Sequence, residues 1–452
     1  MKELERILAA GDNKALAKYV DALKAEAAPN RLRAAEGRRY YENDNQIRRK
    51  GPLEEMLGRA KLEKNPLRSS DFRVSHNWHQ LLVNQKVAYL FSYPPVFDCG
   101  DPDINDKLNR SLGEEFPRVV KNLAIDAANT GEGWLHLWLD RKGDFCYATV
   151  PGEELYCVYN GEIPGTLAYV IRDYTVDGSS GTIERKVEIW NEAEALFFKD
   201  TGEGLKPDRD RGGQSCGLCH GLGSIPFIRF SNNSSGSGDL YMVKDLIDQY
   251  DLVVSGFAND LADIQEVIFV LRNYGGEDLS TFLTELKRYK AIKVEGDAVG
   301  DGGVDTMQIE IPVEARVKFL ELLKKQIFIS GQGVNPDPEV FGNSSGVALK
   351  YLYSLLEIKA GLLETEFRAG FSRFLGLLLK HLGFAPDLPV TQIYSRNAIE
   401  NEVENAEIAV ASQGLISKRT ILRNHPWVED PQQEAEVIAE EERANKNDKD
   451  FK

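Results

Sequence analysis

The strongest constraint on the fold is a regular run of apolar residues between positions 240 and 261. Their spacing alternates between three and four residues, at Leu240, Val243, Ile247, Tyr250, Val254, Phe257 and Leu261. A seam that repeats about every 3.5 residues predicts a helix that buries one narrow stripe against a neighbour. Asp239, just before the seam, is the expected N-cap of this helix. One helix cannot bury such a stripe alone, so a partner is required.

A second helix of this kind is predicted to follow Pro312, with apolar residues at Val313, Val317, Leu320, Leu323 and Ile327. Residues 264–311, between the two helices, have strand-like segments at 266–271, 291–295 and 307–311 and a short helical pattern at 278–289. We therefore expect a hairpin of two helices that carries a small α/β unit at its tip.

A long loop is predicted directly after the second helix. The stretch from Gly331 to Gly346 contains four glycines and two prolines, which stop any helix. A loop of this length inside a compact domain is unusual and is often functional. The following residues, from Val347 to Leu382, have the apolar spacing of one very long helix.

The region before the seam is predicted to be mixed. Residues 1–90 and 110–128 have helical patterns, whereas aromatic and β-branched runs predict strands at 133–139, 145–150, 155–159, 167–172, 186–190 and 195–198. Turn residues separate the strands, which is typical of an antiparallel sheet. A polar linker at 231–238 ends this region, so the fold class is α+β.

Charge and motifs exclude several functions. The net charge is −16, whereas proteins that grip nucleic acid by its phosphates are usually basic. The sequence contains no GxxxxGK(S/T) phosphate loop, no HExxH and no GxSxG. His136 alternates with aromatic residues as a strand residue would, and we interpret it as structural. The sequence therefore gives no reason to predict an enzyme.

The stretch Cys216-Gly-Leu-Cys219-His220 has the spacing of c-type haem attachment and of half a zinc site. Haem is attached outside the cytoplasm, and the charged N-terminus predicts no secretory leader. No apolar run approaches the ~18 residues of a membrane span. We therefore expect a soluble, cytoplasmic chain and a reduced cysteine pair without a cofactor, with zinc at Cys216 and Cys219 as the alternative. His76 and His79 form an HxxH pair, which we interpret as polar residues on a helix.

Three stretches carry a resemblance to a known family. They are Tyr40-Tyr-Glu-Asn-Asp-Asn-Gln46, the run from His220 to Asn233 that leads into 245–260, and Phe341-Gly-Asn-Ser-Ser-Gly-Val-Ala-Leu-Lys350. In this order the chain resembles the portal proteins of tailed double-stranded DNA bacteriophages. The similar branch occurs in long-tailed phages and prophages of Gram-positive bacteria.

The resemblance implies an α+β portal fold that assembles as a ring, typically of about twelve subunits. Its parts would be a wing at 1–237, stem helices at 238–263 and 312–331, a clip at 264–311, a tunnel loop at 332–346, a long wing helix and connection at 347–396, and a crown with a disordered acidic tail at 397–452. The stem would pack through Leu240, Val243, Ile247, Tyr250, Val254, Phe257, Val317, Leu320 and Ile327.

The tunnel loop would meet double-stranded DNA, without sequence specificity, through Asn335, Asp337, Glu339, Val340, Phe341, Asn343 and Ser344. The resemblance also implies terminase, scaffolding, major capsid and head-completion proteins as partners, no membrane, and a place in the virion after assembly in the host cytoplasm. Two alternatives stay open from the residues alone. One is a zinc-binding enzyme centred on Cys216, Cys219 and His220 or on His76 and His79, and the other is a cellular ring-forming scaffold protein.

Overall fold

The computed structural model describes residues 1–49, 70–161, 165–177, 183–212, 217–263, 268–272, 303–307, 312–337, 346–398, 402–423, 428, 434–435 and 437–440. The chain divides into two units. The larger unit comprises Met1–Tyr41, His79–Met242 and Phe328–Lys452, and the smaller unit comprises Glu42–Trp78 and Val243–Ile327. In the described part of the chain, no helix is both long and apolar enough to cross a bilayer.

The larger unit is rich in helices, as the sequence predicts. They are α1 (Lys2–Ala10), α2 (Asn13–Tyr41), α4 (Trp78–Phe91), α5 (Pro102–Leu112), α6 (Phe116–Thr130), α7 (Arg209–Gly212), α12 (Gly346–His381), α13 (Glu402–Ala411) and α14 (Lys418–Arg423), with short 3-10 turns η2 (Gly152–Glu154) and η4 (Asp239–Met242). The single helix predicted over 110–128 is wrong. Gly113, with φ of 69°, ends α5 and separates it from α6, because this left-handed region favours glycine.

Strands at all six predicted places are present and pair antiparallel. One sheet has the order β10-β2-β3, built from Phe227–Ser231, Glu132–Leu139 and Phe145–Val150. A second has the order β4-β5-β6-β7-β8, built from Leu155–Tyr159, Leu167–Asp177, Ile183–Trp190, Glu194–Asp200 and Leu205–Pro207, and β9 (Gly217–Cys219) also pairs with β7. The strands β1 (Val96–Asp98) and β13 (Thr391–Ile393) form a separate pair.

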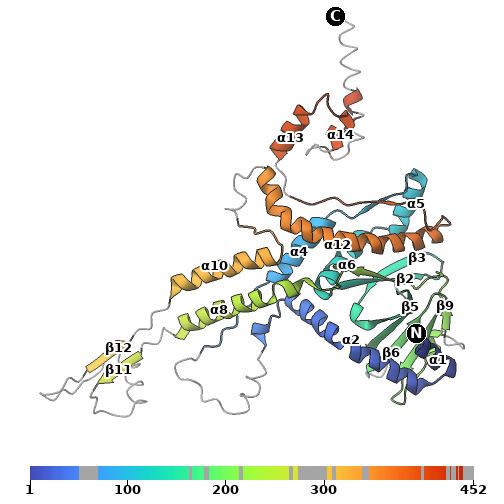
Figure 1. The fold of residues 1–452 in the computed structure, drawn as a ribbon, viewed down its shortest axis with the longest axis horizontal. Coiled ribbons are helices and arrows are strands. Elements are labelled where there is room, and N and C mark those ends of the chain that lie inside the picture. Colours follow the sequence, from blue (N-terminus) through green and yellow to red (C-terminus); the bar gives the residue numbers. More distant parts are fainter. Residues whose placement is uncertain are drawn as a thin grey trace, which may run out of the picture. The chain divides into compact units, whose positions relative to one another are not determined.

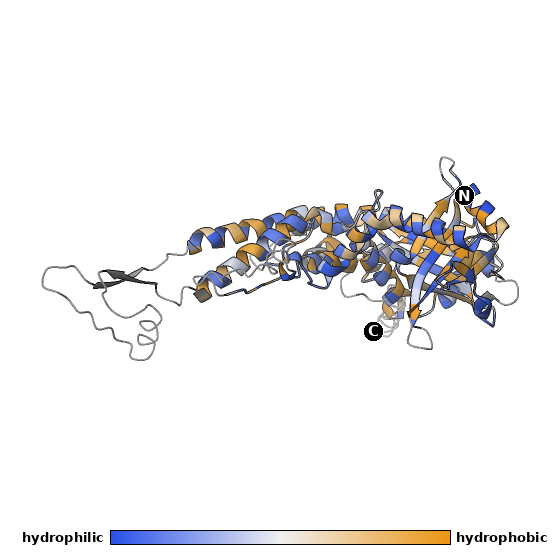
Figure 2. Cartoon of the chain, turned by 90° about the horizontal axis from the view of Figure 1, so that it is seen from below, coloured by the Kyte–Doolittle hydropathy of each residue, from blue (hydrophilic) through white to orange (hydrophobic). Residues whose placement is uncertain are grey.

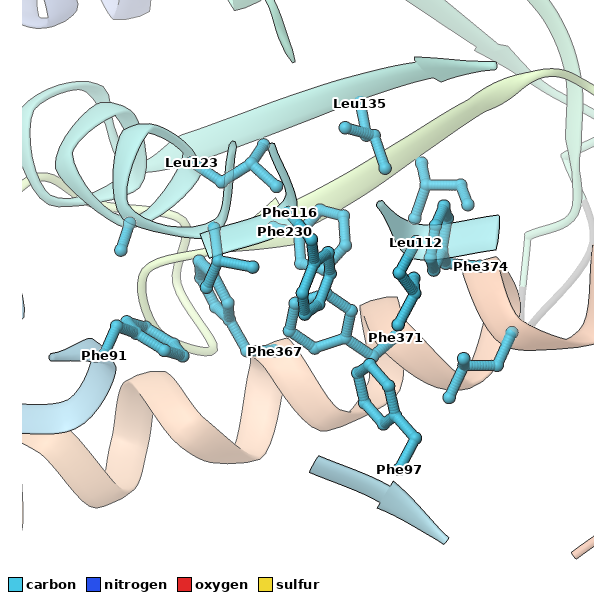
Figure 3. Packing of buried hydrophobic residues seen from close by; sticks show 14 of the residues in the cluster. Phe91, Phe97, Leu112, Phe116, Leu123, Leu135, Phe230, Phe367, Phe371 and Phe374 are labelled. Atoms are coloured by element: carbon cyan, nitrogen blue, oxygen red, sulfur yellow. The ribbon is translucent and has the colours of Figure 1, made fainter. Parts of the chain in front are cut away.

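The main core lies between α12 and the sheet that contains β10. Figure 3 shows Phe367, Phe371 and Phe374 of α12 beside Phe230 of β10. The Phe230 ring centroid lies 5.1 Å from that of Phe367 and 5.0 Å from that of Phe371. A Cβ at Gly370 would come within 2.6 Å of the Phe230 ring, so glycine permits this close approach. The long predicted helix is thus anchored by an aromatic core.

A second core joins the N-terminal helices to the larger sheet. Leu4 of α1 and Leu16 and Val20 of α2 pack with Ile171 of β5 and Val187 of β6. These strand residues share one face of the sheet because side chains alternate along a strand. The N-terminal helical region is therefore a layer over the sheet.

The smaller unit contains the helical hairpin. Its elements are the 3-10 turn η1 (Gln46–Arg48), the helices α8 (Lys244–Asp263) and α10 (Val313–Ser330, whose last turn belongs to the larger unit), and the strands β11 (Ile268–Arg272) and β12 (Gly303–Met307). Figures 1 and 2 show α8 and α10 side by side. The strand predicted at 307–311 is described only at Met307, where β12 ends, and residues 308–311 lie outside the described residues. The predicted helix 278–289 and strand 291–295 also lie outside them.

Candidate functional site

The predicted stem residues, of which Leu240 and Val243 precede α8, differ in burial along the chain. Leu240, Val243 and Ile247 are buried, Tyr250, Val254 and Phe257 are half-buried, and Leu261 is 51% exposed. Burial thus decreases along the chain towards Leu261, whereas on α10 it increases along the chain. Val317 is 42% exposed, Leu320 is half-buried and Ile327 is buried. The ends of both helices near the β11–β12 pair therefore leave apolar side chains in contact with solvent.

An ion pair joins the two helices. The Arg316 guanidinium on α10 pairs with the Asp260 carboxylate on α8, and its carbon lies 5.4 Å from the centroid of the Phe257 ring. A hollow beside this pair is lined by Val253, Gly256, Ala315, Arg316 and Phe319. Figure 2 shows apolar residues, in orange, recurring along both helices. Arg316 thus connects the helices, through Asp260 and the Phe257 ring, where the apolar packing is incomplete.

A polar ladder on α8, which no local pattern in the sequence indicated, holds an extended segment of the same unit. The Phe72 N–H donates to Asn259 Oδ1 (2.6 Å), and the Val74 N–H donates to Ser255 Oγ (3.0 Å). The His76 N–H donates to Asp251 Oδ1 (3.1 Å). Four residues of a helix rise ~6 Å and two residues of a strand rise ~6.7 Å, so the two spacings match.

The buried end of this ladder is the Asp251 carboxylate, which Asn45 and His76 hold. Asp251 is fully buried, and its Oδ2 accepts from Asn45 Nδ2 at 2.6 Å. Its Oδ1 lies 2.7 Å from His76 Nδ1. His76 therefore binds a carboxylate, and it precedes α4 instead of sharing a helix with His79, which corrects our interpretation. Among the residues that the structure describes, no group of three His, Cys, Asp or Glu side chains could hold a metal.

The other two histidines predicted as possible metal ligands, His79 and His220, have separate partners. His79 Nε2 lies 2.9 Å from Asn129 Oδ1, and burial lowers the pKa of His79 to about 4. His220 Nε2 lies 3.0 Å from the Asn191 carbonyl oxygen, and its Nδ1 accepts from the Leu222 N–H at 3.3 Å. Both ring nitrogens of His220 are thus in use. Cys219 is exposed on β9, and Cys216 lies outside the described residues.

His136 is a packing residue, as the strand pattern indicates. Its ring centroid lies 4.3 Å from that of Phe227 in a stacked arrangement. Its Nδ1 lies 3.1 Å from the Pro226 carbonyl oxygen, and burial lowers the pKa of the ring to about 4. Its ring is therefore held between aromatic and backbone partners.

The predicted tunnel loop begins with an ordered base. After α10 the Gln332 N–H donates to the Ile329 carbonyl (3.2 Å) and the Gly333 N–H donates to the Phe328 carbonyl (2.9 Å). Gln332 has φ of 52°, and this pair of bonds with a left-handed residue is the Schellman type of helix end. A Cβ at Gly333 would lie 2.3 Å from Leu82 Cδ2, so a larger residue would require Leu82 on α4 to shift.

Val334 and the next residues continue this order. The Val334 N–H donates to Gln85 Oε1 (3.1 Å), and Gln85 Nε2 donates to the Val334 carbonyl (2.7 Å). Asn335 Nδ2 donates to Asp337 Oδ2 at 2.9 Å. Of the predicted DNA-contacting residues, Asn335 and Asp337 are therefore placed. The others, Glu339, Val340, Phe341, Asn343 and Ser344, lie outside the described residues.

A buried ionic cluster adjoins the base of the loop. Asp239 Oδ2 lies 2.6 Å from Lys86 Nζ and 3.1 Å from Lys359 Nζ, and all three residues are buried. Burial alone would raise the pKa of Asp239, but the two ammonium groups outweigh it and lower that pKa. Burial lowers the pKa of Lys86 to about 8.

This cluster corrects the expectation that Asp239 caps the stem helix. Asp239 lies in η4, α8 begins only at Lys244, and the second carboxylate oxygen, Oδ1, accepts from Asn232 Nδ2 at 2.7 Å. The carboxylate is thus fully used by its lysine and asparagine partners. An N-cap is predicted from neighbouring residues alone. The prediction failed because the lysines that bind Asp239 lie far away in the sequence, on α4 and α12.

Comparisons with known proteins identify the family. The family described as phage portal protein, SPP1 Gp6-like, matches residues 21–448. A portal protein of Clostridium phage phiCD119 is 43% identical over 436 residues, which cover 93% of this chain and 95% of the relative. A portal protein of Bacillus phage SPP1 is 31% identical over 426 residues, which cover 90% of this chain and 82% of the relative.

Two solved structures are similar at lower levels. One is a chain from the neck of a native gene transfer agent particle, with 14% identity, a TM-score of 0.40, and coverage of 76% of this chain and 86% of the other. The second is a chain from the virion of such a particle, with 13% identity, a TM-score of 0.42, and coverage of 75% and 86%.

Proposed function

Because this chain belongs to the SPP1 Gp6-like family of phage portal proteins, we propose that it forms a ring around a DNA channel at one vertex of a phage capsid. The observation in the structure that best supports the ring is the unburied apolar face of the hairpin. Leu252 on α8 is 55% exposed and Leu322 on α10 is 51% exposed. Exposed apolar residues that recur along one element favour a protein interface.

The charges of the two helices favour a neighbouring copy as the partner. Helix α8 has five aspartates and one lysine, whereas α10 has four cationic residues and two glutamates. In a head-to-tail ring, α10 of one subunit would lie against α8 of the next, so opposite charges would meet around the apolar contacts. The stem residues Val254, Phe257, Val317 and Leu320 would then complete their burial between subunits.

The charge of the chain suits a channel through which DNA slides. Each subunit carries −16, so a ring of about twelve copies is strongly negative and repels phosphates. The stretch from Gly331 to Gly346 contains no lysine or arginine. This loop would therefore make only weak contacts with DNA, independent of base sequence, through Asn335, Asp337 and the residues up to Ser344.

The remaining assignments follow the family. Residues 264–311 would meet the terminase during packaging and head-completion proteins afterwards, and the wing and crown would meet scaffolding and major capsid proteins. The ring would assemble in the host cytoplasm and remain in the virion. The portal would act as a conduit, and ATP hydrolysis would belong to the terminase.

Deleting residues 335–344 tests the channel role directly. We expect the variant to form the same ring as the natural chain but to package or retain less DNA, because the loop that contacts the duplex is missing. The measurement is the DNA content of particles that contain each ring. Particles that fill and hold a complete genome without these residues would contradict the proposed role of the loop.

The metal content of the same rings tests the alternative at Cys216 and Cys219. We expect well below one zinc ion per chain by elemental analysis, because His220 already uses both ring nitrogens. One zinc per chain that is lost when both cysteines are changed to serine would establish the zinc site instead.

A further inference from the structure

The base of the channel loop is fixed by two side chains whose roles the portal function does not assign. They are Gln85 on α4 and Lys359 on α12, and they reach successive parts of the same short stretch. Gln85 binds both backbone groups of Val334, at 3.1 and 2.7 Å. Lys359 Nζ donates to the Gly331 carbonyl at 2.9 Å.

We propose that Gln85 and Lys359 form a clamp that positions the DNA-contacting loop by fixing its first residues, Gly331 to Val334. This inference rests on the proposed function, because the loop must contact DNA for its position to matter. The clamp makes both residues positioning residues. Neither is proposed to touch DNA.

The contact made by Gln85 is specific to a primary amide. Its oxygen accepts from the Val334 N–H while its nitrogen donates to the Val334 carbonyl, as a neighbouring strand would. Val334 is buried beside Tyr89, Leu356 and Ala360, where water cannot easily replace Gln85. A methionine has the same length but can neither donate nor accept strongly, so it would leave both backbone groups unsatisfied.

Lys359 connects this base to the buried cluster. Its ammonium pairs with Asp239 at 3.1 Å while it donates to Gly331, and Asp239 also pairs with Lys86 at 2.6 Å. Lys86 is the residue next to Gln85 on α4. The base of the loop is therefore bonded to two helices of the larger unit, α4 and α12. The part of the loop available to contact DNA begins at Asn335.

Hydrogen exchange on the purified full-length chain tests the clamp. In Gln85→Met we expect the amides of residues 331–337 to exchange about tenfold faster or more, because opening no longer breaks two hydrogen bonds. Amides of β6 should exchange at the natural rate. Lys359→Met should accelerate the same amides, and it provides a second variant if Gln85→Met folds poorly. Unchanged exchange at 331–337 in both folded variants would overturn the clamp.

Gln392→Met is the matched control. Gln392 is also half-buried, and its Nε2 donates to the Arg368 carbonyl and to Ser372 Oγ, both at 3.0 Å. The Gln392→Met variant also removes the hydrogen bonds of a primary amide, but from β13, which does not contact the loop. We expect natural exchange at 331–337 in this variant. Equal acceleration in the control would mean that general loosening causes the effect, and would also overturn the clamp.

A packaging measurement separates this inference from the proposed function. Rings with Gln85→Met should form normally but fill or retain DNA less well than rings with Gln392→Met. If Gln85→Met accelerates exchange yet packages like the natural ring, while deletion of 335–344 impairs packaging, the positioning role is wrong and the channel role stands. If the deletion also packages normally, the proposed role of the loop itself fails.

Discussion

The aromatic core of the larger unit and the helical hairpin of the smaller unit bury apolar residues to very different extents. Phe230, Phe367, Phe371 and Phe374 are almost completely buried and contact one another. On the hairpin, Leu252 and Leu322 remain more than half exposed, although they lie on well-formed helices. The core is therefore complete within one chain, whereas the hairpin has apolar surface left for assembly.

The two units also satisfy buried carboxylates in different ways. Asp239 of the larger unit lies between two lysines, whereas Asp251 of the smaller unit accepts from Asn45 and from the backbone and ring of His76. Buried ion pairs add little net stability but are costly to break. The ionic cluster therefore fixes where its helices meet, and the ladder fixes the register of an extended segment.

The largest expected effect is at the ionic cluster. Asp239→Asn would leave Lys86 and Lys359 without their shared carboxylate, and breaking such a buried pair costs about 3–5 kcal/mol. The measurement is the free energy of unfolding in urea. The control is Asp210→Asn, whose exposed carboxylate pairs with Lys199 at 3.5 Å and should contribute less than about 1 kcal/mol. Similar losses in both variants would contradict the structural role of the cluster.

The next effect depends on pH and belongs to His79. Its pKa is about 4 in the folded chain and 6.5 as the ordinary value, so the unfolded chain binds more protons between these values. The contribution of His79 to the free energy of unfolding is therefore fully present above pH 6.5. It is lost as the pH drops towards 4, and the loss is up to about 3 kcal/mol.

Comparison of the natural chain with His79→Gln isolates this contribution. Glutamine can still donate to Asn129 but does not titrate. The His79→Gln variant should therefore lose less stability than the natural chain between pH 6.5 and 4. His136, whose pKa is also lowered to about 4, remains in both proteins and cancels in the difference. Identical pH profiles would show that His79 is not buried as a neutral ring.

A smaller effect on the single chain is expected on the hairpin. Leu322→Ser removes an apolar side chain that is already half exposed, so unfolding of a monomer should change by less than about 1 kcal/mol. The same change should weaken every contact between subunits and shift the equilibrium from rings to monomers, measured by sedimentation. A variant that loses stability without any loss of rings would indicate that Leu322 packs within one chain.

The smallest effect is at the end of α10. Gln332 has φ of 52°, a conformation that glycine adopts without strain. Gln332→Gly should therefore leave stability unchanged or raise it by up to about 1 kcal/mol, because relief of strain and the added flexibility of the unfolded chain oppose each other. Thermal unfolding measures this. A loss above about 2 kcal/mol would mean that the Gln332 side chain has a role in holding the loop.

The elements that the sequence predicted well are those set by local patterns. The part of the seam within α8, the end of α10 at the glycine-rich stretch and the long helix up to His381 depend on spacing and composition within one segment. The strands depend on β-branched and aromatic runs in the same way. Gly113 could have been recognised as a helix end, but the surrounding apolar spacing outweighed it.

The parts that could not be predicted depend on residues far apart in the chain. Asp239 was expected to cap a helix because nothing nearby indicates that Lys86 and Lys359 surround it. The four-residue spacing of Asp251, Ser255 and Asn259 is visible in the sequence, but the segment from Phe72 to His76 that they bind is not. Gln85 likewise has no local feature that relates it to Val334.

The most direct test of the portal assignment is native mass spectrometry of the full-length chain, alone and together with scaffolding and major capsid proteins of the same phage. We expect a closed ring of about twelve copies of the 50.6 kDa chain in at least one of these mixtures. Only monomers, or open polymers without a fixed number of copies, in every mixture would contradict it.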